Sequence, residues 1–200
     1  MIRSLSRPEF AGAQRVLVAR DGGQAVARLV ARRSPSLRDG EGKPYGLLGF
    51  FEATSGHPEA VARLFAEAVA WLHDTGAGAV VGPMDGDTWH RYRLNVGPFG
   101  DPPFLSEPYN PPYYQRLWES NGFTVLSRYY SKRVDAGDVV SHLRARHWAA
   151  LDAGYRLRPL DLLRLPDELR LLYALSRRIF AKNFLYTEIP EEEFLALYNG

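Results

Sequence analysis

The sequence predicts an α/β fold in which a central mixed, mostly antiparallel sheet is flanked by helices. Segments 15–20 and 24–33 have the composition of strands, and the Asp-Gly-Gly turn at 21–23 joins them as a hairpin. The run 45–53 is nearly continuous in apolar residues, which is typical of a buried strand. An amphipathic helix begins directly after it at Pro58 and ends at an Asp-Thr-Gly sequence. These three observations favour the α/β class.

The segments around these elements can be assigned in order. Residues 34–44 read as a loop, and Gly49, inside the buried strand, indicates a bulge or a close approach of two backbones. Residues 79–83 form the next strand. The stretch 84–101 is long and irregular, and stretches of that length in compact domains are usually functional or mobile. Residues 104–109 return to extended structure.

One short helix has both of its ends marked in the sequence. We expect Asn110 to cap its first amides, and Pro111 suits the first helical position, where no N–H donor is needed. The residues at helical spacing on its apolar face are Tyr113, Tyr114, Leu117 and Trp118. Asn-Gly at 121–122 ends the helix, and the β-branched and aromatic run 124–132 predicts a strand directly after it.

The composition allows a substantial core and excludes several kinds of chemistry. A chain of 200 residues with 46% hydrophobic residues buries enough apolar surface for a stable domain. A formal net charge of +2 is too small to favour a nucleic-acid partner, although it does not oppose an anionic ligand. The absence of cysteine excludes disulfides and thiolate catalysis and is compatible with a cytoplasmic location, which we expect. No segment has the length of a membrane span, so no membrane partner is expected.

The short aromatic helix carries a resemblance to a known superfamily. An asparagine at a strand end, a short aromatic helix and then Gly-Phe resemble the acyl-CoA end of the GCN5-related N-acetyltransferase (GNAT) superfamily. The likeness covers roughly residues 15–133, and segments 46–51, 82–84 and 108–123 carry it. It implies a GNAT-like acyl-CoA N-acyltransferase fold without the strand and two helices with which the family normally begins.

The resemblance also implies a division of the chain. Residues 1–137 would form the GNAT-like core, and residues 138–200 a linker followed by a strand at 155–159 and helices from Pro166 and Pro190. In one interpretation, this later part begins the second half of a branch with two fused acetyltransferase-like halves. In the other, it completes the first fold as a circular permutation, or by exchange between the subunits of a homodimer.

The family binds the pyrophosphate of acyl-CoA with backbone amides between the bulged strand and the main helix. The corresponding frame here is 53–58, in which Gly56 matches the family pattern and Pro58 lacks an N–H. The residues expected to bind acetyl-CoA or another acyl-CoA cosubstrate are Thr54, Ser55, Gly56, His57 and Asn110. The histidines show no zinc-ligand spacing, so no metal is expected.

Acyl transfer to an amine needs a base for the amine and a proton donor for the leaving thiolate. The resemblance places Glu52 at the end of the bulged strand as the base, with an ordinary solvated carboxylate as the alternative. The family's frequent tyrosine acid falls on Trp118, whose indole is no acid at neutral pH. Tyr114 or its neighbour Tyr113 would then donate the proton, and simple packing of the helix onto the sheet is the alternative role.

The run 89–93 suits an acceptor pocket. Trp89, His90, Arg91 and Arg93 combine cations with aromatic rings, which can clamp a phosphate or carboxylate or stack on a planar group. The alternative is a loop pinned by its tryptophan, with its arginines paired to nearby aspartates.

Two functions follow from these residues. The first is an acyl-CoA-dependent N-acyltransferase acting on an amine of a small molecule or peptide, and the second is a catalytically inactive GNAT-like ligand- or protein-binding module.

Overall fold

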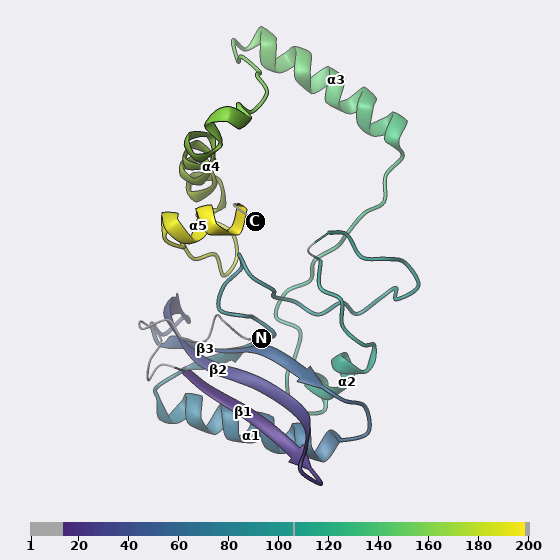
Figure 1. Ribbon diagram of the computed structural model, residues 1–200, viewed down its shortest axis with the longest axis vertical. Helices are drawn as coiled ribbons and strands as arrows, with labels where there is room; N and C mark the ends of the chain where they lie inside the picture. The colour runs from purple at the N-terminus through teal and green to yellow at the C-terminus, as the bar shows by residue number, and fades with distance from the viewer. Residues whose placement is uncertain (1–13, 106, 199–200) are drawn as a thin grey trace. The chain divides into compact units, whose positions relative to one another are not determined.

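The computed structural model describes residues 14–105 and 107–198, and Figure 1 shows them as a ribbon. The elements in chain order are β1 (Gln14–Asp21), β2 (Gln24–Arg38), β3 (Pro44–Ala53), α1 (Pro58–Asp74), β4 (Ala79–Val81), α2 (Tyr113–Glu119), α3 (Ala136–Asp152), a 3₁₀ turn (Leu162–Arg164), α4 (Leu165–Phe180) and α5 (Glu191–Tyr198). They fall into two compact units. The first holds the chain up to Thr124 together with Phe180–Ile189, and the second holds Val125–Ile179 and the chain from Pro190 onward. No helix within the described ranges has the length and apolar character needed to cross a membrane.

The sheet of the first unit has the order β1-β2-β3-β4. The first three strands pair antiparallel, and β4 pairs parallel to β3. α1 packs along one face of the sheet (Figure 1), where its buried residues are Val61, Leu64, Phe65, Ala68 and Leu72. This arrangement confirms the predicted α/β class with a mixed, mostly antiparallel sheet flanked by helices.

Aromatic side chains join α1, α2 and the sheet into one core. The Trp118 ring lies 4.8 Å from those of Phe65 and Phe123, measured between centroids, and Phe51 lies 4.9 Å from Tyr114. The predicted apolar face of α2 therefore contacts the core, with Tyr114 and Trp118 fully buried. Because this packing anchors α2 beside the end of β3, side chains from both elements meet there.

β3 is bulged where it leaves its parallel partner. Phe50 and Phe51 together lie opposite one residue of β2, and Phe50 has a φ of 51°. Gly49 lies so close to the chain after β4 that an added Cβ would overlap the Met84 carbonyl oxygen. Both interpretations of Gly49, a bulge and a close backbone approach, are thus confirmed. The bulge turns the end of β3 away from β4 and opens a space between them.

Three local expectations for the chain before α3 are wrong. β2 continues to Arg38, so the loop is shorter than 34–44. The structure assigns no strand at 124–132, which lies outside the described sheet β1-β2-β3-β4 and whose side chains are largely exposed. Asn110 does not cap α2, which begins only at Tyr113 with Pro112 at the N-cap position. The Asn110 side chain instead holds the backbone of Asn95, accepting from its N–H at 2.8 Å and donating to its carbonyl at 3.0 Å.

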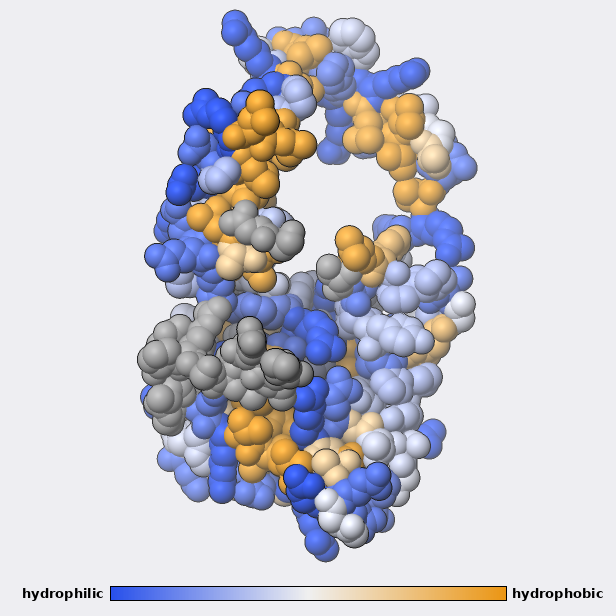
Figure 2. Space-filling model, viewed as in Figure 1, coloured by the Kyte–Doolittle hydropathy of each residue, from blue (hydrophilic) through white to orange (hydrophobic). Residues whose placement is uncertain are grey.

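The second unit differs most from expectation. α3 occupies part of the predicted linker, and its first turn is capped by the Asp135 carboxylate, which accepts from the Gly137 N–H. The strand predicted at 155–159 is absent from the described chain, since the segment has no ladder partner. The two later helices form where expected, as α4 and α5. Figure 2 shows apolar side chains gathered over α4, and the exposed large ones are Leu171, Leu172, Leu175, Ile179 and Phe180.

Candidate functional site

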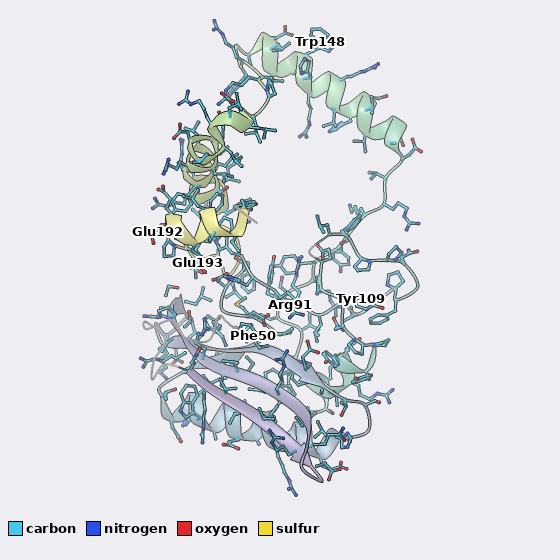
Figure 3. The ribbon with its side chains drawn as sticks, viewed as in Figure 1. Phe50, Arg91, Tyr109, Trp148, Glu192 and Glu193 are labelled. Atoms are coloured by element: carbon cyan, nitrogen blue, oxygen red, sulfur yellow. The ribbon has the colours of Figure 1, made fainter. Side chains whose placement is uncertain are left out.

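A cleft opens where β3 bends away from β4. It encloses about 480 Å³, including space open to solvent, between the end of β3, the chain after β4 and the start of α2. Its lining residues are Phe50, Phe51, Glu52, Pro83, Asp85, Arg91, Tyr92, Arg93, Leu94, Pro108, Tyr109, Asn110 and Tyr114. Three of them, Phe50, Arg91 and Tyr109, are labelled in Figure 3. The charged lining residues are Glu52 near the end of β3 and Asp85, Arg91 and Arg93 in the chain after β4.

Glu52 and Tyr114 form a hydrogen-bonded pair in this cleft. The Tyr114 hydroxyl donates to Glu52 Oε2 at 2.7 Å and accepts from the Ala53 N–H at 2.9 Å. Burial, and then the hydrogen bond to Glu52, raise the pKa of Tyr114 well above its usual value of 10.0. The phenol therefore keeps its proton and orients one carboxylate oxygen of Glu52. The other predicted acid, Tyr113, donates its hydroxyl hydrogen to the Ala53 carbonyl at 2.8 Å.

A second carboxylate, Asp85, faces the same cleft; from the sequence it was expected only as one of the aspartates that pair with the loop arginines. Its side chain is only 11% exposed, and Oδ1 accepts the Phe50 N–H at 2.6 Å. Burial raises the pKa of Asp85 above its ordinary value of 3.8, against the opposing effects of the Phe50 N–H and Arg91. The strand bulge explains this contact, because it removes the Phe50 amide from the ladder and leaves it to a side chain. The sequence signal was a carboxylate directly after the strand-ending Gly-Pro-Met.

The predicted acceptor loop divides into two parts. The Trp89 indole donates to the Thr187 carbonyl at 3.0 Å and packs on Phe180, so it anchors the 180–189 segment of the same unit. His90 Nδ1 lies 2.9 Å from an oxygen of Asp87. Neither Trp89 nor His90 lines the cleft, whereas Arg91 and Arg93 do.

Both cleft arginines have carboxylate neighbours. Arg93 Nη2 lies 3.4 Å from Glu107 Oε1, and its guanidinium also lies over the Tyr92 ring. Arg91 Nε lies 3.6 Å from Asp85 Oδ2, and its Nη1 lies 3.9 Å from Glu52 Oε1. The alternative raised from the sequence, arginines paired to nearby acids, is therefore part of the arrangement.

The loop between β3 and α1 offers backbone donors. Thr54 is tied to the sheet through its N–H, which donates to the Val26 carbonyl at 2.8 Å. Within the described chain the amides of Ser55 and Gly56 donate no hydrogen bond. A Cβ added to Gly56 would meet nothing within 4 Å, so its surroundings are open. His57 makes no side-chain cap to α1, and its Nε2 lies 3.4 Å from an oxygen of Asp21. Free amides beside a helix N-terminus fit an anionic group such as a pyrophosphate.

No protein-family model matches the chain. Among curated proteins, it is similar to Protein YghO of Escherichia coli, with 25% identity over 184 residues that cover 90% of this chain and 46% of that protein. It is also similar to the Bacterial ceramide synthase of Caulobacter vibrioides, with 26% identity over 180 residues that cover 89% of this chain and 47% of the synthase. The chain thus spans about half the length of the curated relatives it matches.

Solved structures that align with part of this chain include two N-acetyltransferases. A transcriptional regulator from Bacillus halodurans aligns over 61% of this chain and 67% of its own, at 15% identity and a TM-score of 0.39. A ribosomal-protein-alanine N-acetyltransferase from Brucella melitensis aligns over 62% and 73%, at 16% identity and a TM-score of 0.38. An aminoglycoside N-acetyltransferase in complex with CoA aligns over 61% and 78%, at 14% identity and a TM-score of 0.37.

Proposed function

We propose that this chain contributes to an acyl-CoA-dependent N-acyltransferase that transfers an acyl group to an amine. The observation that carries the proposal is the Glu52–Tyr114 pair, which lies at the opening between two strands, one of them bulged. A carboxylate with one oxygen fixed and the other directed into a partly apolar cleft is suited to accept a proton from an amine. The free amides of Ser55 and Gly56 lie further along the same chain segment.

In the proposed reaction, Glu52 takes a proton from the acceptor ammonium, and the amine nitrogen attacks the thioester carbonyl carbon. The C–N bond forms and the C–S bond breaks, so the products are an amide and the CoA thiolate. The second amine proton leaves the nitrogen as the amide forms. One of the two protons goes to the thiolate, which gives the CoA thiol, and the other is released to solvent. Because the pKa of Tyr114 is raised, we assign this hydroxyl to holding Glu52 in position. We propose the exposed side of the cleft as the route by which the thiolate is protonated.

The acyl-CoA would be held by its pyrophosphate at the loop that precedes α1. Ser55 and Gly56 would supply amides, and His57 would supply a side-chain donor at its rim. The Thr54 hydroxyl donates to the Val26 carbonyl at 3.2 Å, so Thr54 would hold the loop in place. Pro58 removes one amide that a phosphate would otherwise use. In this proposal Asn110 acts indirectly, because its side chain holds the Asn95 backbone beside the cleft.

A long-chain amine is the acceptor that we propose. The Caulobacter relative is named a ceramide synthase, and a ceramide is a long-chain amino alcohol acylated on its nitrogen. Apolar side chains along this cleft, including Phe50, Leu94 and Tyr109, would contact an alkyl tail. The proposal retains the division into 1–137 and 138–200, in which the later part begins a second acetyltransferase-like half of a longer protein.

The proposal is tested by thiol release from acyl-CoA in the presence of an alkylamine. Because the sequence has no cysteine, a thiol-reactive dye reports free CoA without a protein background. We expect Glu52→Gln to lower turnover by about a hundredfold or more, since general bases contribute ~10²–10⁴. Glu67→Gln, which removes an exposed carboxylate paired with Arg15, serves as the matched control and should leave turnover unchanged. Equal turnover in the two variants would contradict the role of Glu52.

One arrangement favours a second function, a binding module without catalysis. The Phe50 N–H already donates to Asp85 and the Tyr114 hydroxyl already donates to Glu52, so neither donor is free to contact an acyl-CoA. If the protein binds CoA or an amine but releases no thiol, this second function replaces the first. Titrations of CoA and amines, run beside the thiol assay, separate the two, since only the transferase couples binding to amide formation.

A further inference from the structure

The cleft holds two carboxylates that share one cation. Arg91 Nη1 lies 3.9 Å from Glu52 Oε1, and its Nε lies 3.6 Å from Asp85 Oδ2. We propose that the place between Glu52 and Asp85 is the binding site for the ammonium group of the acceptor, and that Arg91 is an internal occupant which the acceptor displaces. That the bound amine is the acyl acceptor rests on the proposed function, whereas the cation site itself follows from the contacts.

Each carboxylate divides its oxygens between the protein and the cleft. Asp85 Oδ1 accepts from the Phe50 N–H, which leaves Oδ2 as the oxygen near Arg91. Glu52 Oε2 accepts from the Tyr114 hydroxyl, which leaves Oε1 as the oxygen near Arg91. Two oxygens are therefore oriented by the fold, and the other two converge on one cationic group. The fold therefore orients both carboxylates toward a cation without any contribution from Arg91.

The Arg91 side chain is poorly held, whereas its backbone is fixed. The Arg91 carbonyl accepts from the Asp85 N–H at 2.8 Å, and Met84 and Tyr92 pair beside it. The guanidinium is in contrast 62% exposed, and both of its carboxylate distances exceed the ~2.7–2.9 Å of a charge-assisted hydrogen bond. Exposed ion pairs of this length contribute little to stability. The guanidinium can therefore swing into solvent while the loop keeps its conformation.

The exchange conserves charge. With Glu52 and Asp85 ionised and Arg91 present, the group carries one net negative charge, and displacement of Arg91 by a monovalent ammonium leaves the two carboxylates with one cation. A primary ammonium is smaller than a guanidinium and offers three N–H donors for the two free oxygens. A neutral alcohol of the same length lacks the charge that this site recognises. The site thus favours primary amines over alcohols.

The test is calorimetric titration of hexylamine, without acyl-CoA, into the wild-type protein and its variants. Arg91→Gln should tighten hexylamine binding by about three- to fivefold, since an exposed ion pair of this kind gives up roughly that much. The matched control is Arg15→Gln, because Arg15 is also an exposed arginine paired with a carboxylate, Glu67, outside the cleft. Asp85→Asn keeps an oxygen for the Phe50 N–H but removes the charge. It should weaken hexylamine binding at least fivefold.

Each outcome bears on the proposal. The proposal is supported if hexylamine binds more tightly to Arg91→Gln but not to Arg15→Gln, and binds more weakly to Asp85→Asn. The thermal stability of Asp85→Asn must be unchanged. Identical affinities in Arg91→Gln and Arg15→Gln would overturn the internal-occupant role, and absence of hexylamine binding in every variant would overturn the site. If hexylamine binds as expected but no thiol is released from acyl-CoA, the proposed function fails and the cation site stands. If thiol is released but hexylamine saturation is unchanged in Arg91→Gln and Asp85→Asn, the cation site fails and the proposed function stands.

Discussion

Replacement of Gly49 by alanine tests whether the bulge in β3 organises the cleft. A Cβ at this position would overlap the Met84 carbonyl oxygen and lie 2.8 Å from Asp85 Cα. Ordinary contacts of carbon lie at about 3.5 Å or beyond, so the chain after β4 must move by roughly 1 Å. The contacting atoms belong to the backbone, so no side-chain rotation relieves the clash.

Two effects of these contacts lower the free energy of unfolding of Gly49→Ala. Overpacking of a closely packed site destabilises by about 1–3 kcal/mol, and loss of the hydrogen bond from the Met84 N–H to the Leu48 carbonyl adds about 1 kcal/mol. We expect Gly49→Ala to lower the free energy of unfolding by about 3 kcal/mol. Urea unfolding followed by tryptophan fluorescence measures this, because Trp118 is buried in the core beside this strand.

A control glycine shows whether the effect comes from the close approach. A Cβ added to Gly40 would have no atom within 4 Å, and Gly40 has no positive φ. Gly40→Ala should therefore change the free energy of unfolding by less than about 0.5 kcal/mol. If Gly49→Ala unfolds at the same urea concentration as Gly40→Ala, the packing of β3 against the chain after β4 is not as described, and the cleft geometry falls with it.

Three further predictions concern the cleft. Burial raises the pKa of Asp85, so the folded state binds a proton more readily than the unfolded state, and the contribution of Asp85 to stability falls as pH rises from 3.8 through its folded pKa. Urea midpoints measured against pH should show this decline in the wild-type protein and lose it in Asp85→Asn. An unchanged decline in Asp85→Asn would contradict the assignment to Asp85. Tyr114→Phe frees one oxygen of Glu52, and we expect about tenfold slower thiol release with an unchanged midpoint for CoA binding; an unaltered rate would remove the positioning role. For alkylamines of increasing length, affinity should rise about fourfold per added CH₂ while the tail is in contact with the apolar wall, and calorimetry showing no dependence on length would exclude a tail site.

The fold could be predicted where local chemistry determines it. The hairpin turn, the buried β3 and the start of α1 at Pro58 each carry their own signals within a few residues. The strand at 124–132 was predicted on composition alone, and composition does not provide a hydrogen-bonding neighbour. α3 was missed because arginines alternate with apolar residues along it, a pattern that we interpreted as a linker, and none of its residues is buried against the rest of the described chain.

The site could be predicted in part for a related reason. Glu52, Tyr113 and Tyr114 were chosen because the resemblance implied them, and the structure brings them together around Ala53, while their catalytic roles stay predictions. The place of Asp85 in the cleft was missed because it depends on the left-handed Phe50, whose amide the bulge releases. A single sequence does not show which amide a bulge will release, and it therefore does not show which carboxylate will receive it.

Titration of acetyl-CoA, and separately of free CoA, tests the central claim that this chain binds acyl-CoA at the loop before α1. We expect both to bind the wild-type protein and Gly56→Glu to abolish binding, since it places a negative charge beside the free amides. Gly56→Gln is the matched control, because it shares the φ of 90° at this position without the charge, and it should retain binding. No heat from either ligand up to millimolar concentration, or equal loss in both variants, would contradict the claim.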